Sequence, residues 1–479
     1  MRISNAREPR RSVRLYAMYA VALLAAMAFF NTVDMTVLPA VLSSIQAEFH
    51  LSDTELGLLN AAFTVAFALA AIPIGYWADR GSRRMIIGLG VAVWSLFTLL
   101  AGLTQSFAQM LAVRSVVGIG EASYQPAGGS LIGDYYDRRS RGRANAAVVA
   151  LGGLGIGSGF IIGGAVGLQF GWRAAFFLVG GPGLLLALLA FTIREPLRGA
   201  AEVAGPRLVV ARDAGLRAFG RLLRVRTFAG AVAASTLSLF GFSILGFLPL
   251  YLERRFGLNL AQAGGLVGVP QLAATILATP LVGGLIDWRA RRTPRAAAEV
   301  GFCGTLLAGL GAIVMFTAGS VRVFTAGEML FSVTAVAATL APIVILQNVI
   351  VPSLRASAGS LNLTASRLLG SALSPIVVGA VSDFAHGNLG LSMLVLGPSG
   401  FLLSAGAFAL AMGSMKGDVA AMETSWAANQ SLEPRSLPTL TPSCTALKTR
   451  PFRVGLSGLG VDDHGRETIL VTRPLRCWM

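Results

Sequence analysis

Residues 75–84 read Gly-Tyr-Trp-Ala-Asp-Arg-Gly-Ser-Arg-Arg and join two long apolar segments of this chain. A weaker copy, Gly-Gly-Leu-Ile-Asp-Trp-Arg-Ala-Arg-Arg, occupies residues 283–292. Each copy places one carboxylate at the end of an apolar segment and a cluster of arginines directly after it. A membrane protein built from two related halves shows such a pattern at its equivalent turns. The two turns therefore predict a duplicated membrane protein.

The amino-acid composition also indicates a chain surrounded by lipid. Hydrophobic residues make up 54% of the 479 residues and charged residues only 13%, whereas a soluble domain carries about 25% charge. The net charge of +16 would suit a nucleic-acid partner, but nearly all of it is arginine in short connections between apolar runs. We therefore expect no nucleic-acid partner and assign the arginines to membrane topology.

Twelve apolar segments come close to the length of about 20 residues that a helix needs to cross the hydrocarbon core. The first half contains the spans 15–40, 56–76, 85–104, 108–132, 144–168 and 173–193. The second half contains the spans 227–251, 262–287, 298–318, 322–349, 358–382 and 391–413. The pattern predicts an all-α integral membrane protein with bundles at 15–193 and 227–413, joined by a basic linker at 194–226.

The distribution of arginine predicts the orientation of these spans. The arginine-rich segments fall on one side of the predicted membrane; they are the amino terminus 1–14, the turns 80–84, 138–143 and 289–295, the linker and the turn at Arg355. The opposite side has few arginines, among them Arg254, and acidic residues that include Asp53. Both termini of this multi-pass cell-membrane protein should therefore be cytoplasmic. Residues 414–479 lose apolar periodicity, which predicts a disordered cytoplasmic tail.

The sequence predicts neither a metal site nor an enzyme active site. Cysteines and histidines are few and scattered over one span, the external loops and the tail: Cys303, Cys444, Cys477, His50, His386 and His464. No histidine reaches the predicted membrane interior, where it would be needed to activate a serine or cysteine. We expect no catalytic residues, metal or cofactor. A membrane-embedded enzyme and a sensor without flux remain weaker alternatives.

The fourth span carries two opposite charges on one helical face. Arg114, Gly118, Glu121 and Gln125 follow each other at positions i, i+4, i+7 and i+11. A charge at the bilayer centre costs about 2.5 to 3.5 kcal/mol on insertion scales. This face must therefore meet polar partners or a water-filled cavity.

Further polar residues lie inside other spans. Asn31 and Asp34 share a face of the first span, so Asp34 is a candidate partner of Arg114. Glu328 lies in the tenth span and Arg367 lies about ten residues into the eleventh. Arg367 either binds an anionic head group or pairs with Glu328, and the sequence leaves both possibilities open.

Twelve spans, a central basic linker and the repeated turn together resemble the major facilitator superfamily over about residues 12–413. The family signature of the turn is matched at Gly75, Asp79, Arg80, Arg83 and Arg84, with Ser82 where glycine is preferred. The resemblance implies two pseudo-symmetric six-helix bundles and a cytoplasmic gate at this turn, with Asp287 as the corresponding acid of the second copy. Asp79 is suited to accept hydrogen bonds from the amides at a neighbouring helix start. Alternatively, the arginines merely fix topology.

The fifth span contains Gly155, Gly157, Gly159, Gly163 and Gly164. This run resembles the antiporter signature of the superfamily, except that phenylalanine replaces its proline. Glycines at such spacing also let helices pack closely without any exchange mechanism. Both interpretations stay open.

A narrower resemblance is carried by Gly-Ile-Gly-Glu-Ala-Ser-Tyr at 118–124. This run is similar to the spinster branch, whose members are linked to export of lysophospholipids and sphingosine phosphate. Arg114 matches the fourth-helix arginine of the superfamily, which faces the central cavity and supports proton coupling. The branch usually has arginine after the first-span aspartate, but here Met35 follows Asp34. A proton site therefore carries over, whereas a substrate contact by that arginine does not.

The resemblance implies a secondary active transporter that exports a small amphipathic molecule by alternating access, coupled to protons. It assigns proton coupling to Asp34, Glu121 and Arg114. The expected substrate-cavity residues are Asn31, Gln125, Glu328 and Arg367. A general drug or small-solute exporter is the alternative. We expect a monomer in the lipid bilayer.

The predicted topology can be tested with single cysteines in a background without the native cysteines. Cysteines at Ser82 and Ser106 should react with a membrane-impermeant maleimide from opposite sides of a sealed membrane, because one membrane span separates them. Reaction of both from the same side would contradict the twelve-span prediction.

Overall fold

The computed structural model describes residues 8–137, 140–196, 220, 222–351 and 354–432, and every element within them is helical. Contacts divide the chain into a compact unit of residues 1–428 and a second unit of residues 429–479. The account below concerns the first unit. Of the predicted segments, most of the linker and the cysteines and histidine of the tail lie outside the described residues.

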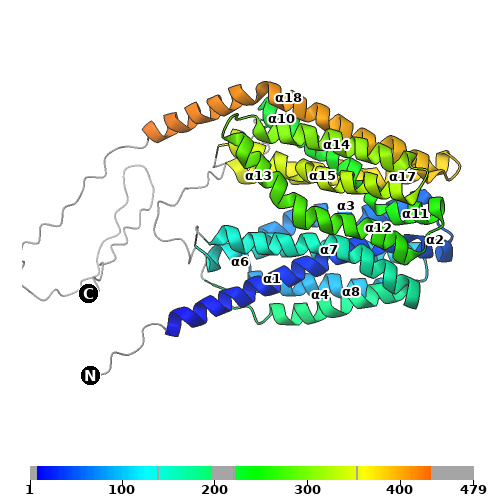
Figure 1. The fold of residues 1–479 in the computed structure, drawn as a ribbon. Helices are drawn as coiled ribbons and strands as arrows, with labels where there is room; N and C mark the ends of the chain where they lie inside the picture. Colours follow the sequence, from blue (N-terminus) through cyan, green and yellow to red (C-terminus); the bar gives the residue numbers. More distant parts are fainter. Residues whose placement is uncertain (1–7, 138–139, 197–219, 221, 352–353, 433–479) are drawn as a thin grey trace, which may run out of the picture. The chain divides into compact units, whose positions relative to one another are not determined.

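The first half consists of the helices α1 (Glu8–Ala40), α2 (Leu42–Phe49), α3 (Asp53–Arg80), α4 (Arg83–Ala101), α5 (Phe107–Glu121), α6 (Tyr124–Tyr135), α7 (Arg141–Phe170) and α8 (Trp172–Ala190). Figure 1 shows the long helices running side by side. The capping box of Ser52 and Glu55 starts α3, since each satisfies a backbone amide of the other.

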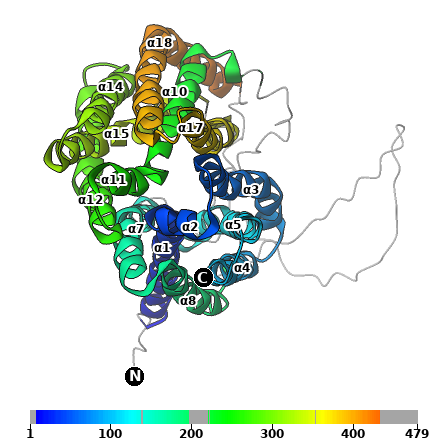
Figure 2. The same ribbon diagram turned by 90° about the vertical axis from the view of Figure 1, so that its right-hand side faces the viewer.

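The second half consists of α10 (Arg226–Phe242), η1 (Ser243–Gly246), α11 (Leu248–Phe256), α12 (Leu260–Ala273), η2 (Ala274–Ala278), α13 (Thr279–Ala290), α14 (Ala296–Thr317), α15 (Val321–Val349), α16 (Arg355–Ala365), η4 (Ser366–Ala372), α17 (Leu373–Phe384) and α18 (Leu389–Leu432). Figure 2, viewed along the helices, shows the two halves as two groups that meet where α12 lies beside α7 and α17 lies beside α3. The segments η2 and η4 are π-helical turns inside longer helices, a feature that is frequent at functional sites.

The twelve-helix prediction is confirmed, although the seventh predicted span, 227–251, is divided into α10, η1 and α11, and the fourth is also interrupted. Eleven of the described helices are long and apolar enough to cross a membrane. The remaining predicted span, 108–132, is divided into α5 and α6 at Ala122 and Ser123. The Ser123 hydroxyl donates to the Gly120 carbonyl at 2.8 Å, which offers the backbone an alternative to the helical bond. Glu121 consequently lies at the end of a helix.

Glycines let α7 pack closely on two sides. Gly155 and Gly159 face the backbone of α1, and a side chain at either position would overlap it. Gly157 and Gly268 of α12 face each other's carbonyl oxygens, so the two halves approach each other there through backbone atoms. This geometry accounts for the glycine run as a packing device.

The last helix is longer than predicted. α18 ends at Leu432, whereas the predicted span ended at residue 413 and the tail began at 414. Within this extension the Asp418 carboxylate accepts a hydrogen bond from the Thr227 amide at 2.9 Å. Asp418 thereby caps the first turn of α10, which ties the extended helix to the second half.

Candidate functional site

The first part of the candidate site is a buried ion pair between α1 and α5. Arg114 Nη1 lies 3.5 Å from Asp34 Oδ2, and the two side chains are 2% and 0% exposed. The hydroxyl of Thr98 donates to the other oxygen of Asp34 at 3.0 Å. The Arg114 guanidinium also lies 5.3 Å from the ring centre of Phe63. The pairing considered for Asp34 and Arg114 is thus present in this conformation.

Glu121 completes the cluster without completing its hydrogen bonds. Its side chain is buried beside Asp34, Arg114 and Asn31. Within the described part of the chain, neither carboxylate oxygen of Glu121 has a hydrogen-bond partner. The Nε of Arg114 has none there either. Buried polar atoms are normally satisfied. The cluster therefore has free hydrogen-bonding capacity for a proton, water or ligand.

The second half contributes a cation to the same region. Arg367 belongs to the π-helical turn η4, and its guanidinium lies 5.3 Å from the ring centre of Phe67 on α3. It also interacts electrostatically with Glu121. The charge cluster is therefore shared between the halves, with two carboxyl groups and one arginine from the first half and one arginine from the second.

Glu328 forms a separate polar site within the second half. Its Oε1 accepts hydrogen bonds from Ser332 at 2.9 Å and Gln271 at 3.4 Å, while Oε2 has no partner among the described residues. The pairing of Glu328 with Arg367 is not among the ion pairs of the described chain, and Arg367 lies against the first half instead. Of the other predicted cavity residues, Asn31 is buried in the cluster, and the side chain of Gln125 lies outside the described residues.

The charged groups around Arg83, in the turn after α3, find their partners within the first half. Arg83 is fully buried, pairs with Asp134, and donates from Nε to Glu195 Oε1 at 3.0 Å. Burial alone would raise the pKa of Glu195, but hydrogen bonds from the Arg83 amide, Ser82 and the Arg83 guanidinium lower it below its usual range. Arg83 therefore holds α4, α6 and the segment after α8 together. This end of the bundle is called here the Arg83 end.

The other predicted gate residues are less engaged in this conformation. Arg80 stacks on Tyr76 with its guanidinium 3.6 Å from the ring centre, and Arg84 and Asp287 are exposed. A β-carbon added at Gly75 would meet no other atom within 4 Å. The Asp79 side chain lies outside the described part of the chain.

The opposite end, called here the Asp53 end, is closed by an ion pair and by hydrogen bonds between the halves. Arg254 of α11 binds both oxygens of Asp53 at 2.6 and 2.9 Å. Asp383 of α17 accepts hydrogen bonds from the amides of Asp53 and Thr54 at 3.0 and 2.9 Å. A carboxylate from the second half thus caps the first helical turn of α3, where the helix dipole favours a negative charge.

Sequence reasoning missed the role of this closure. It noted Asp53 and Arg254 only as charges on one side of the membrane and did not single out Asp383. The capping box of Ser52 indicates the start of α3 but not the partner that comes from α17. In contrast, the sequence singled out Asp34, Arg114 and Glu121 as proton-coupling residues, and the structure brings these three side chains together, because charges inside apolar spans must find each other.

Two six-span halves, a charge cluster shared between them and an ion pair that helps to close one end define a membrane transporter of the two-bundle class. The chain belongs to the Major Facilitator Superfamily, whose family model matches residues 24–375.

Relatives place the chain in the spinster branch. An MFS-type efflux pump of Mycolicibacterium smegmatis is 30% identical over 393 residues, 81% of this chain and 88% of that protein. The sphingosine-1-phosphate transporter SPNS2 of Mus musculus is 30% identical over 376 residues, 74% of this chain and 67% of that protein. A bacterial homolog of the human lysosomal transporter spinster, in an inward-facing and unoccupied conformation, matches with a TM-score of 0.73 at 26% identity, covering 85% of this chain and 98% of that one. The protein is thus a transporter and not an enzyme.

The closure at the Asp53 end can be tested by removing one charge. Asp383→Asn should shift the population toward a conformation open at that end, because the cap on α3 loses its charge and part of its hydrogen bonding. A loss of about 1 kcal/mol corresponds to a change of about fivefold in the ratio of the two states. Distances between spin labels at Gln105 and Gly319, both exposed at this end, report the opening.

Asp418→Asn is the matched control for this experiment. It removes the same kind of carboxylate cap from α10, but within one half. It should leave the label distances unchanged. Equal distance distributions in Asp383→Asn and the unmodified protein would show that the cap does not hold this end closed.

Proposed function

We propose that this transporter exports an amphipathic, lysophospholipid- or sphingolipid-like molecule across the cell membrane in exchange for protons. The observation that carries the proposal is the buried cluster of Asp34, Arg114 and Glu121 with Arg367 facing it from the other half. Its unfilled hydrogen-bonding capacity suits a polar head group. The similarity to a sphingosine-1-phosphate transporter supports a lipid-like substrate.

The unequal ends of the molecule support a mechanism of alternating access. The Asp53 end is bridged by Arg254 and Asp383, whereas the ion pairs described at the Arg83 end each join residues of one half. This conformation would bind substrate from the Arg83 end, which we assign to the cytoplasm together with both termini. In the opposite conformation the turn after α3, with Gly75, Asp79 and Arg80, would meet the second half and close the cytoplasmic side.

The position of the carboxyl groups supports proton coupling. Protonation of Asp34 would weaken its ion pair with Arg114 and free the guanidinium for an anionic head group. Glu121 interacts with Arg367 of the other half, so its electrostatic surroundings change when the halves move apart. Protons and substrate would therefore compete for one cluster, which is the requirement for exchange. Each monomer contains the complete cluster, so no second copy is needed.

The substrate's apolar part would lie between the two halves. Phe63 and Phe67 of α3 flank Arg114 and Arg367 and offer aromatic surface next to the cations. Asn31 and Gln125 would add hydrogen bonds near the head group. Glu328, which lies in the second half and has only neutral partners, would mark the far limit of this cavity.

A general drug or small-solute exporter is the second candidate function. The similarity to an MFS-type efflux pump, at 30% identity over most of both chains, favours it. The same charge cluster would then bind a cationic or polar compound through Asp34 and Glu121 rather than an anion through the arginines.

Neutralising the two acids tests the proton sites. Asp34→Asn and Glu121→Gln should each fold but reduce pH-driven flux to background, because an amide keeps the size and hydrogen bonding yet exchanges no proton. Arg114→Ala should be more damaging, since it leaves the Asp34 carboxylate buried without its ion pair. Flux is measured in proteoliposomes with an imposed pH gradient, with Asp418→Asn as a control for amide substitution. Unaltered pH dependence in both variants would refute these proton sites.

The substrate class is decided by a comparison in the same vesicles. A lysophospholipid should move when a pH gradient is applied, whereas a hydrophilic sugar should not, because the aromatic surface beside the arginines favours an amphipathic molecule. Flux of drug-like cations is measured as a third comparison in the same vesicles. Sugar or drug flux without lysophospholipid movement would reject the lipid substrate and support the second candidate function.

A further inference from the structure

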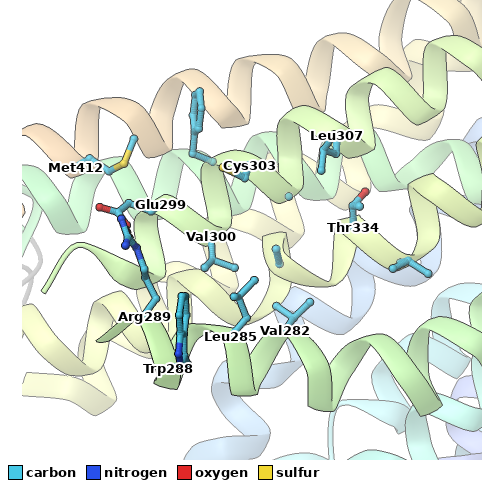
Figure 3. Close-up of a pocket in the computed structure, with 14 residues that line it drawn as sticks. Val282, Leu285, Trp288, Arg289, Glu299, Val300, Cys303, Leu307, Thr334 and Met412 are labelled. Carbon is cyan, nitrogen blue, oxygen red and sulfur yellow. Dashed lines mark hydrogen bonds and ion pairs between the residues drawn. The ribbon is translucent and has the colours of Figure 1, made fainter. Parts of the chain in front are cut away.

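A separate cavity lies within the second half, away from the charge cluster. Its volume is about 580 Å³, within the usual range of about 300 to 1,000 Å³ for small-molecule sites. Figure 3 shows it between α13 and α14, with Thr334 of α15 and Met412 of α18 at its sides. Because its walls come from one half, it is not part of the path between the halves.

The body of this groove is apolar and open to the surroundings of the protein. Val282 and Leu285 of α13 face Val300 and Leu307 of α14 across it. Leu285 is 48% exposed and Leu307 is 42% exposed. On a membrane-spanning bundle such exposed apolar side chains meet hydrocarbon chains. The apolar side chains along most of the groove therefore suit contact with an acyl chain.

One end of the groove is polar. Arg289 Nε lies 2.8 Å from Glu299 Oε2, and both side chains are partly exposed, at 41% and 29%. Trp288 lies next to this pair, and the guanidinium of Arg292 is 4.6 Å from its ring centre. Tryptophan and arginine at the end of a span are typical of the level of the lipid head groups.

The charge at this end favours an anion. Among the described residues, Arg289 donates only through its Nε, to Glu299, so its two terminal amino groups are left for another acceptor. Arg291, Arg292 and Arg295 follow in the same turn, and the only acids of this segment are Asp287 and Glu299. A guanidinium donates in a fork that fits a phosphate group. The mouth thus combines a net positive charge with guanidinium groups, which are suited to bind phosphate.

We propose that this groove binds an anionic phospholipid of the surrounding membrane, with one acyl chain along α13 and α14 and its phosphate held by Arg289 and Arg292. The apolar body and the basic mouth belong to one continuous cavity, which is the arrangement that a phospholipid requires. The bound lipid is distinct from the transported substrate. This inference does not rest on the proposed export function.

Cys303 provides the measurement, because it lines the groove and is exposed. In a background with Cys444→Ser and Cys477→Ser, a maleimide should alkylate Cys303 of delipidated protein in detergent. Added phosphatidylglycerol should slow the reaction, because its chain covers the thiol. Phosphatidylcholine should slow it less at the same concentration, and inorganic phosphate, which has no chain, should not slow it.

The arginines of the mouth are tested by substitution. Arg289→Gln with Arg292→Gln should reduce the preference for phosphatidylglycerol by about fivefold for each arginine removed. Arg143→Gln with Arg322→Gln removes the same charge from exposed positions elsewhere and should keep the preference. Native mass spectrometry of the same samples counts bound lipids. If the double variant fails to fold, the single variant Arg292→Gln is used to measure the preference for phosphatidylglycerol.

Three outcomes would overturn the proposal. Equal protection by both phospholipids would identify ordinary lipid contact without head-group recognition. Protection by inorganic phosphate alone would identify an anion site without a chain. Retention of the phosphatidylglycerol preference after removal of the mouth arginines would place the recognition elsewhere.

Discussion

The cost of a charge in hydrocarbon is the constraint on which this structure depends. A buried ion must find a counter-ion, hydrogen bonds or water, because the bilayer supplies none of them. Asp34, Arg114 and Glu121 satisfy this requirement by gathering on the inner faces of α1 and α5, and Arg367 approaches them from the second half. The helices must therefore surround a shared polar centre, and this centre is the site that we propose for substrate and protons.

Helix α3 links that centre to the closed end of the molecule. Its first turn carries the amides capped by Asp383, its middle presents Phe63 and Phe67 to the two arginines, and its last turn leads into the arginine-rich turn. The sequence assigned the capping of a helix start to Asp79 at the far end of α3. The structure shows the same chemistry at Asp383, which lies near the end of α17 as Asp79 lies near the end of α3. A carboxylate cap is a suitable latch, because it is lost as soon as the two helices separate by more than a hydrogen-bond length.

Close backbone contact and local irregularity together determine how the halves meet. Gly157 and Gly268 bring α7 and α12 into backbone contact, which holds this pair of helices close together. The π-helical turn η4 changes the helical register within the eleventh span and carries Arg367, and the break after Glu121 ends a helix beside the charge cluster. Such departures from regular helix place polar groups where a continuous helix would not. The site proposed for substrate and protons thus lies at irregular positions of otherwise regular spans.

The sequence by itself determined the number of spans, the duplication and the charge cluster of the first half. Apolar length and charges spaced at helical periods are local properties, and a helix must form its hydrogen bonds internally in lipid. It did not determine the break in the fourth span, the extension of α18 to Leu432, the approach of Arg367 to Glu121, or the closure by Asp53, Arg254 and Asp383. Those features depend on which residues of two distant halves come together, and the partners in the closure lie hundreds of residues apart in the chain. Only the tertiary structure decides such pairings, because each residue alone looks like an ordinary charge at the end of a span.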